Sequence, residues 1–157
     1  ELIDSSGKRN LTYSKQGYEV HIAYSILGRA ALLKDDIELA KNFLTMMPPF
    51  GQPDWRHDLL LAKELLDRGE ANAVQDYLRA CANNLSDRIW ELSKIPADES
   101  RVPAWLTMVW ESHAPELSLT EFMQLSLKEG VKEIDEWVAE IGKGRKLKLP
   151  DFSQYDC

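Results

Sequence analysis

Apolar residues recur every three or four positions along most of the first half of the chain, which is the spacing of an amphipathic α-helix. One such run spans 19–33 and contains Val20, Ala23, Tyr24, Leu27, Ala30 and Ala31. A second run carries Ile37, Ala40, Phe43, Leu44 and Met47. Asp35 or Asp36 can cap this second helix, and Pro48 with Pro49 stops it, because proline has no amide hydrogen to donate. No segment alternates with period two for long enough to form a convincing strand, so the pattern predicts an all-α fold.

Two further helices are predicted between 54 and 81, separated at Arg68 and Gly69. Their apolar positions are Leu59, Ala62, Leu65 and Leu66, then Ala73, Val74, Tyr77, Leu78 and Cys81. One constant shift superimposes the second pair of helices on the first, matching Leu27-Gly28 with Leu61-Ala62, Asp35-Asp36 with Gly69-Glu70, Ala40 with Val74, and Phe43-Leu44 with Tyr77-Leu78. The shift has the length of the tetratricopeptide repeat, about 34 residues, whose unit is a pair of antiparallel helices. The sequence therefore predicts two tetratricopeptide-like hairpins within 16–84.

The C-terminal half is less regular. Ser86 with Asp87 can cap a short helix, and an aromatic-rich segment occupies 104–110. Ser118 and Glu121 have the spacing of a capping box, which predicts a helix start, and a last amphipathic helix is expected after Gly130. Two repeats are fewer than a stable solenoid needs, so these helices are expected to cap the stack. We expect six or seven helices in one domain, 1–157, made of an N-terminal arm (1–15), the two hairpins (16–84) and a C-terminal helical cap and tail (85–157).

The same segments resemble a bacterial family of tetratricopeptide-like proteins, many of unassigned function. The resemblance is carried by HIAYSILGRAALLKDDIELAKNFL and LLLAKELLDRGEANAVQDYLRAC, at His21, Leu27-Gly28-Arg29, Ala31-Leu32, Asp35-Asp36, Ala40-Lys41, Leu65-Leu66, Gly69-Glu70 and Val74 to Leu78. Residues 134–152 are similar to that family's ending of Trp, Ile, Gly and Pro-Asp-Phe. The loop at 47–58 is shorter than in the family, and 86–130 has no counterpart in it. The resemblance implies a helical-repeat fold and assigns no catalytic residue.

Composition narrows the possible partners. The chain has 26 acidic and 19 basic residues and a net charge of -7, which argues against general nucleic-acid binding. It has no run of apolar residues long enough to span a membrane. Its cysteines, Cys81 and Cys157, have no spacing typical of a disulfide framework or a zinc site, which fits a reducing compartment. We expect a cytoplasmic protein, and because the chain starts at Glu1 we expect it to be processed or trimmed, with any targeting signal removed.

Catalytic motifs are not found in the sequence. His21, His57 and His113 have no spacing typical of a metal site or a catalytic triad. Neither a nucleophile-elbow motif nor a phosphate-binding loop occurs. The sequence therefore predicts a protein without enzymatic activity, with no catalytic residue, metal or cofactor.

The expected function is binding of a protein or peptide. In tetratricopeptide repeats the first helix of each unit usually lines the concave binding face, which nominates Tyr24, Arg29, His57 and Lys63. Trp55 lies in a turn rich in glycine and proline and is a further contact candidate, because loops often carry binding residues. The alternative is an acidic immunity or inhibitor protein that neutralises a basic toxin or nuclease by direct binding, which the small size and acidic charge favour. The oligomeric state is left open.

Overall fold

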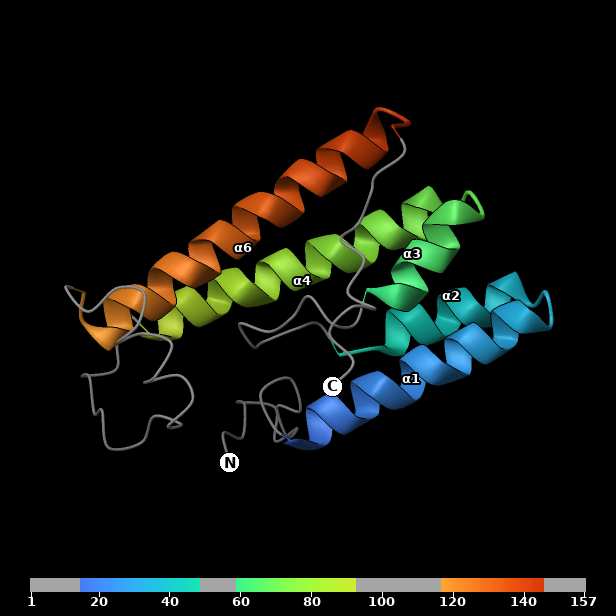
Figure 1. Cartoon of the computed structure of the whole chain (residues 1–157), viewed down its shortest axis with the longest axis horizontal. Helices are drawn as coiled ribbons and strands as arrows, with labels where there is room; N and C mark the ends of the chain where they lie inside the picture. The colour runs from blue at the N-terminus through green and yellow to red at the C-terminus, as the bar shows by residue number, and fades with distance from the viewer. Residues whose placement is uncertain (1–14, 49–58, 93–116, 146–157) are drawn as a thin grey trace.

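A computed structural model describes residues 15–48, 59–92 and 117–145 of the chain (Figure 1). These residues form five helices: α1 (Lys15–Leu33), α2 (Ile37–Met46), α3 (Leu60–Asp67), α4 (Ala71–Leu92) and α6 (Leu119–Gly142). They contain no strand, so the all-α class is confirmed for the part of the chain that the structure describes. None of the described helices is long and apolar enough to cross a membrane.

The helices pack in pairs. α1 contacts α2 and α3, α2 contacts α3 and α4, and α3 contacts α4. The α4–α6 contact is the most extensive, and the two helices lie side by side and antiparallel in Figure 1. The Gln75 side-chain amide, near the start of α4, donates to the Val138 carbonyl near the end of α6 at 2.9 Å. The α3–α4 pair therefore lies between the α1–α2 pair and α6.

The core is almost entirely apolar and draws on every described helix. Its largest fully buried side chains are Leu44, Leu61, Leu65, Leu78, Leu85, Ile134, Val74 and Cys81. Burying one leucine or valine side chain stabilises the fold by about 1.5–3 kcal/mol relative to its exposure. Because these side chains come from both hairpins and from α6, the core joins all three parts.

The two turns between paired helices have the same pattern of backbone hydrogen bonds at equivalent positions of the repeat. In the first turn the amides of Lys34, Asp35 and Asp36 donate to the carbonyls of Ala31, Leu32 and again Ala31. In the second turn the donors and acceptors are Arg68, Gly69 and Glu70 with Leu65, Leu66 and again Leu65. These bonds use the carbonyls that a helix end leaves without an intrahelical partner. The turns thus follow the same shift along the chain as the apolar pattern.

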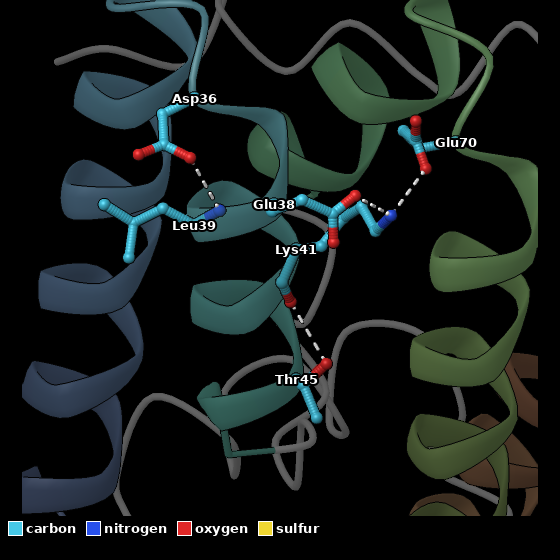
Figure 2. A network of polar contacts seen from close by, with 6 residues as sticks. All are labelled: Asp36, Glu38, Leu39, Lys41, Thr45 and Glu70. Atoms are coloured by element: carbon cyan, nitrogen blue, oxygen red, sulfur yellow. Dashed lines mark hydrogen bonds and ion pairs between the residues drawn. The ribbon is translucent and has the colours of Figure 1, made fainter.

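Lys41 links α2 to the start of α4 through two ion pairs. Asp36 caps α2 by accepting a bond from the Leu39 amide at 3.1 Å. Figure 2 shows the Lys41 ammonium reaching two carboxylates, Glu38 at 2.7 Å on its own helix and Glu70 at 3.1 Å just before α4. The bonds to Glu38 and then Glu70 raise the pKa of Lys41 above its ordinary value. The ammonium is therefore held charged between α2 and the start of α4.

Three predicted boundaries are wrong. α1 starts at Lys15, so this residue is not part of the N-terminal arm. Ser86 does not cap a new helix: α4 continues through it to Leu92, and its hydroxyl donates to the Ala82 carbonyl at 2.9 Å. Likewise α6 continues through Gly130 as a single helix. In both helices the buried positions stay in phase across the predicted break. α4 and α6 also make the most extensive contact between described helices.

One predicted helix start is confirmed, and two segments that the sequence analysis names lie outside the described residues. Ser118 and Glu121 form the predicted capping box, each accepting a bond from the other's backbone amide. The aromatic-rich segment at 104–110 and the tail beyond 145 lie outside the described residues.

Candidate functional site

Helix α1 has three stripes of residues, each spaced by three or four positions. Residues at these intervals lie on one side of a helix. The first stripe faces the core and consists of His21, Ser25, Gly28 and Leu32, all buried. The second stripe, which includes Arg29, and the third stripe (Ala23, Leu27 and Ala30) are otherwise apolar and largely exposed, which is unusual for a surface helix of a globular protein.

Gly28 on the core stripe sets the distance between α1 and α3. A Cβ atom at this position would overlap the Cδ2 atom of Leu61 and lie 2.9 Å from its Cδ1 atom. Leu61 is fully buried. A side chain at position 28 would therefore displace the buried Leu61 side chain or move α3, and glycine lets the two helices approach closely.

His21, in the first half of α1, joins this helix to Pro48, just after the end of α2. It is buried, and its Nδ1 lies 3.1 Å from the Pro48 carbonyl oxygen. Since a carbonyl can only accept, Nδ1 carries the hydrogen in this contact. His21, which the family resemblance singles out, thus serves the packing of the first hairpin.

The second stripe of α1 lies beside α3 and is the candidate site. It consists of Ile22, Ile26, Arg29 and Leu33. Ile26 is 59% exposed and Leu33 88% exposed. On α3 the matching side carries Leu60, Lys63, Glu64 and Asp67, spaced by three and four. We call these eight residues together the α1–α3 face.

An ion pair joins the two halves of the α1–α3 face. The Arg29 Nε–H donates to a Glu64 carboxylate oxygen at 2.8 Å. The two side chains are 44% and 36% exposed, so the pair adds at most about 1 kcal/mol to stability. The bond uses only the Nε–H of a guanidinium that has further donors in its terminal NH₂ groups. Arg29 can therefore hold Glu64 and bind an additional carboxylate.

The sequence-predicted site residues fall in different places. Arg29 and Lys63 both belong to the α1–α3 face. Tyr24 does not share this side of α1. Its ring is half-buried and its centroid lies 6.0 Å from that of the Phe43 ring of α2, with an angle of 33° between the two ring planes. Trp55 and His57 lie outside the described residues. Two of the five nominated residues thus lie on the α1–α3 face.

The apolar members of the face were not among the nominated residues. Ile26, Leu33 and Leu60 lie outside the apolar runs predicted from the sequence, and sequence spacing alone does not tell which apolar stripe a neighbouring helix covers. The available signal was that α1 is apolar on more than one side, which leaves part of it without a place in the core.

Metal chemistry finds no support in the described residues, which contain no group of three or more His, Cys, Asp or Glu side chains placed to hold a metal ion. Cys81, the cysteine within the described ranges, is buried in the core and forms no disulfide. The chemistry that the α1–α3 face can offer therefore rests on its apolar and charged side chains.

Comparison of the chain with models of protein families, with curated proteins and with solved structures finds no match.

Proposed function

We propose that the chain is a non-catalytic module of two stacked tetratricopeptide-like hairpins that binds a peptide segment of a partner protein on the α1–α3 face. The order of helix contacts supports the repeat assignment. In such a stack the two helices of each hairpin pack together, and each of them also contacts the next hairpin. The described helices follow this scheme: α1 packs on α2, α3 packs on α4, and both α1 and α2 contact the second pair. The left-handed residues of the two turns, Asp35 and Gly69, are separated by the same shift as the apolar pattern, which supports the repeat assignment as well.

The observation that carries the binding proposal is the exposed apolar surface beside an arginine. Ile26 and Leu33 flank Arg29 on one side of α1, three and four residues away. Exposed apolar side chains in a contiguous row mark interaction surfaces, and arginine is enriched among the residues that dominate binding energy. The first helices of both hairpins supply this surface, as expected for a repeat that binds along its concave side.

The composition of the face indicates the chemistry of the peptide. Ile26, Leu33 and Leu60 would contact its apolar side chains, and the free donors of Arg29 would bind one of its carboxylates. A charge-assisted bond of this kind contributes about 1.5–3 kcal/mol when it is made away from water. The ligand is therefore an amphipathic peptide that places an acidic residue between apolar ones.

The test starts from selection of a random peptide library displayed on phage against the full chain. A selected peptide, made synthetically, is then titrated by calorimetry into the wild type and two variants. Arg29→Ala removes both roles of the arginine, whereas Glu64→Gln removes the charge of its partner and leaves Arg29 in place. We expect Arg29→Ala to weaken binding about tenfold or more and Glu64→Gln to bind at least as tightly as the wild type.

A second pair of variants tests the apolar contribution. Ile26→Glu places a charge on the face, and Leu125→Glu places the same charge on an exposed leucine of α6. The proposal expects only the first to abolish binding. Equal losses in Arg29→Ala and Glu64→Gln would mean that Arg29 only holds α1 to α3, and an affinity unchanged by Ile26→Glu would overturn the site.

A further inference from the structure

The internal repeat places the same pair of residues on the first helix of each hairpin. The shift that relates the two hairpins matches Ile26 with Leu60 and Arg29 with Lys63. On both helices an exposed apolar side chain therefore precedes a cationic one by three residues, on the α1–α3 face. The exposed fractions of Ile26 and Leu60 are 59% and 37%. The two first helices thus contribute equivalent apolar and cationic side chains to the face.

The two cations differ in the partners that they have within the fold. Arg29 donates its Nε–H to Glu64 at 2.8 Å and has further donors in its terminal NH₂ groups. Lys63 is half-buried. None of the described carboxylates, including that of Asp67 one turn further along α3, forms an ion pair with its ammonium. Partial removal of an ammonium from water costs free energy, which a carboxylate from a ligand offsets. Lys63 is therefore a second position on the face where an acidic group can bind.

Helix packing sets the spacing of the two cationic positions. α1 and α3 are in contact, and helices that pack directly lie about 8–10 Å apart, axis to axis. An extended peptide rises about 3.3 Å per residue, so about two or three residues span this distance. A peptide that crosses from α1 to α3 can therefore place one carboxylate on Arg29 and another on Lys63.

We infer that the peptide bound on the α1–α3 face carries two acidic residues, about two or three positions apart, and that Lys63 binds the second of them. This ligand chemistry rests on the proposed function, because Lys63 serves the same face. It gives each hairpin one apolar contact and one carboxylate contact, so the ligand repeats a pattern as the chain does. Lys63 then determines specificity, since it favours peptides with a second carboxylate at this spacing.

The first test is the composition of the peptides selected on the full chain. They are expected to share two acidic positions at this spacing, and selection on a Lys63→Met variant is expected to retain only one of them. Methionine has a side chain of similar length to that of lysine and carries no charge. A set of wild-type peptides with a single shared acidic position would overturn the inference and leave the proposed function standing.

The second test measures affinities by calorimetry. One selected peptide is compared with two forms of it, in each of which one acidic residue is replaced by its amide. We expect Lys63→Met to bind the parent peptide about threefold more weakly than the wild type or worse, and Lys63→Arg to restore the affinity. This loss should vanish for one amide form and persist for the other. The matched control Lys128→Met removes the same charge from an exposed position of α6 and should bind like the wild type.

The outcomes separate the role of Lys63 from that of the face as a whole. Equal affinities of the wild type and Lys63→Met, with Arg29→Ala and Ile26→Glu still weakening binding, would overturn the inference alone. A loss in Lys63→Met that is the same for all three peptides would also overturn it, because the lysine would then act without meeting a carboxylate. Failure of the proposed function shows separately, as an affinity that Ile26→Glu leaves unchanged.

Discussion

Asp35 and Gly69 occupy equivalent positions in the two hairpins and both have a left-handed backbone, with φ angles of 60° and 89°. Each follows a helix by two residues and donates its amide to the carbonyl of the third residue before it. Glycine takes this conformation without a steric cost, and aspartate is among the few other residues that tolerate it. Arg68 links the two turns, since it donates to the Asp35 carboxylate at 3.2 Å and to the Leu32 carbonyl at 3.1 Å.

Replacement of Gly69 by alanine tests the turn geometry. No atom lies within 4 Å of a Cβ placed there, so the substitution changes only the backbone preference. We expect Gly69→Ala to lower the free energy of unfolding by about 1–2 kcal/mol, measured by urea denaturation. Gly144→Ala is the matched control and should show a loss of the same kind, because Gly144 has φ of 69° and an equally open surrounding at the end of α6. An unchanged stability in Gly69→Ala would contradict the left-handed turn.

The close approach of α1 and α3 predicts a non-additive pair of substitutions. In the wild type, Gly28→Ala should destabilise by about 1–3 kcal/mol, because the new methyl group overlaps Leu61. With Leu61→Ala already present the overlap is gone. Gly28→Ala should then be neutral or stabilise by up to about 1 kcal/mol through its better helix propensity. A double-mutant cycle of unfolding free energies measures this coupling, and additive effects would show that the two helices do not meet at Gly28.

The capping box of α6 predicts a dependence on acid. The bond from the Ser118 hydroxyl and then that from its backbone amide hold the pKa of Glu121 below its ordinary value of 4.5. A lowered pKa stabilises the folded state above the ordinary value, and the gain is lost as the pH falls through the lowered one. The stability advantage of the wild type over Glu121→Gln should therefore be constant at neutral pH and shrink in acid. A pH series of thermal unfolding measures it, and an advantage that persists at low pH would contradict the box.

Lys41 predicts the opposite dependence at high pH. Its pKa is raised by Glu38 and Glu70, so the stabilisation is complete below the ordinary value of 10.5 and is lost as the pH rises through the raised one. The advantage of the wild type over Lys41→Gln should thus hold at neutral pH and fall in strong base. Both partners are at the surface, so added salt should reduce it as well. Glu70→Gln provides the control, since it should remove part of the same advantage, and an insensitivity to pH and salt would exclude the bridge.

The helices and turns were predictable because their signals are local. The spacing of apolar residues located α1 to α4, and the two aspartates before α2 indicated a turn and a cap. The structure assigns one task to each: Asp35 takes the left-handed conformation and Asp36 caps the helix. Ser86 misled the prediction because serine favours helix starts, yet inside a helix its hydroxyl can bond a carbonyl four residues earlier.

The candidate site was predictable only in part, because exposure depends on which neighbours cover a helix. Arg29 and Lys63 followed from the repeat, in which the first helix of each unit lines the binding side. Ile26 and Leu33 are not in the predicted apolar run of this helix, and they are exposed because the stripe that faces the core is the one from His21 to Leu32. Tyr24 was nominated by the same rule as Arg29, but its position on the helix turns it toward Phe43.

The most direct test of peptide binding on the α1–α3 face is a titration of ¹⁵N-labelled full chain with a selected peptide, followed by two-dimensional NMR. The account predicts that the largest shift changes fall on residues 22–33 of α1 and 60–67 of α3, with Arg29 among them, and that Arg29→Ala weakens them. Shift changes centred on α6, or spread evenly over all the helices, would contradict it.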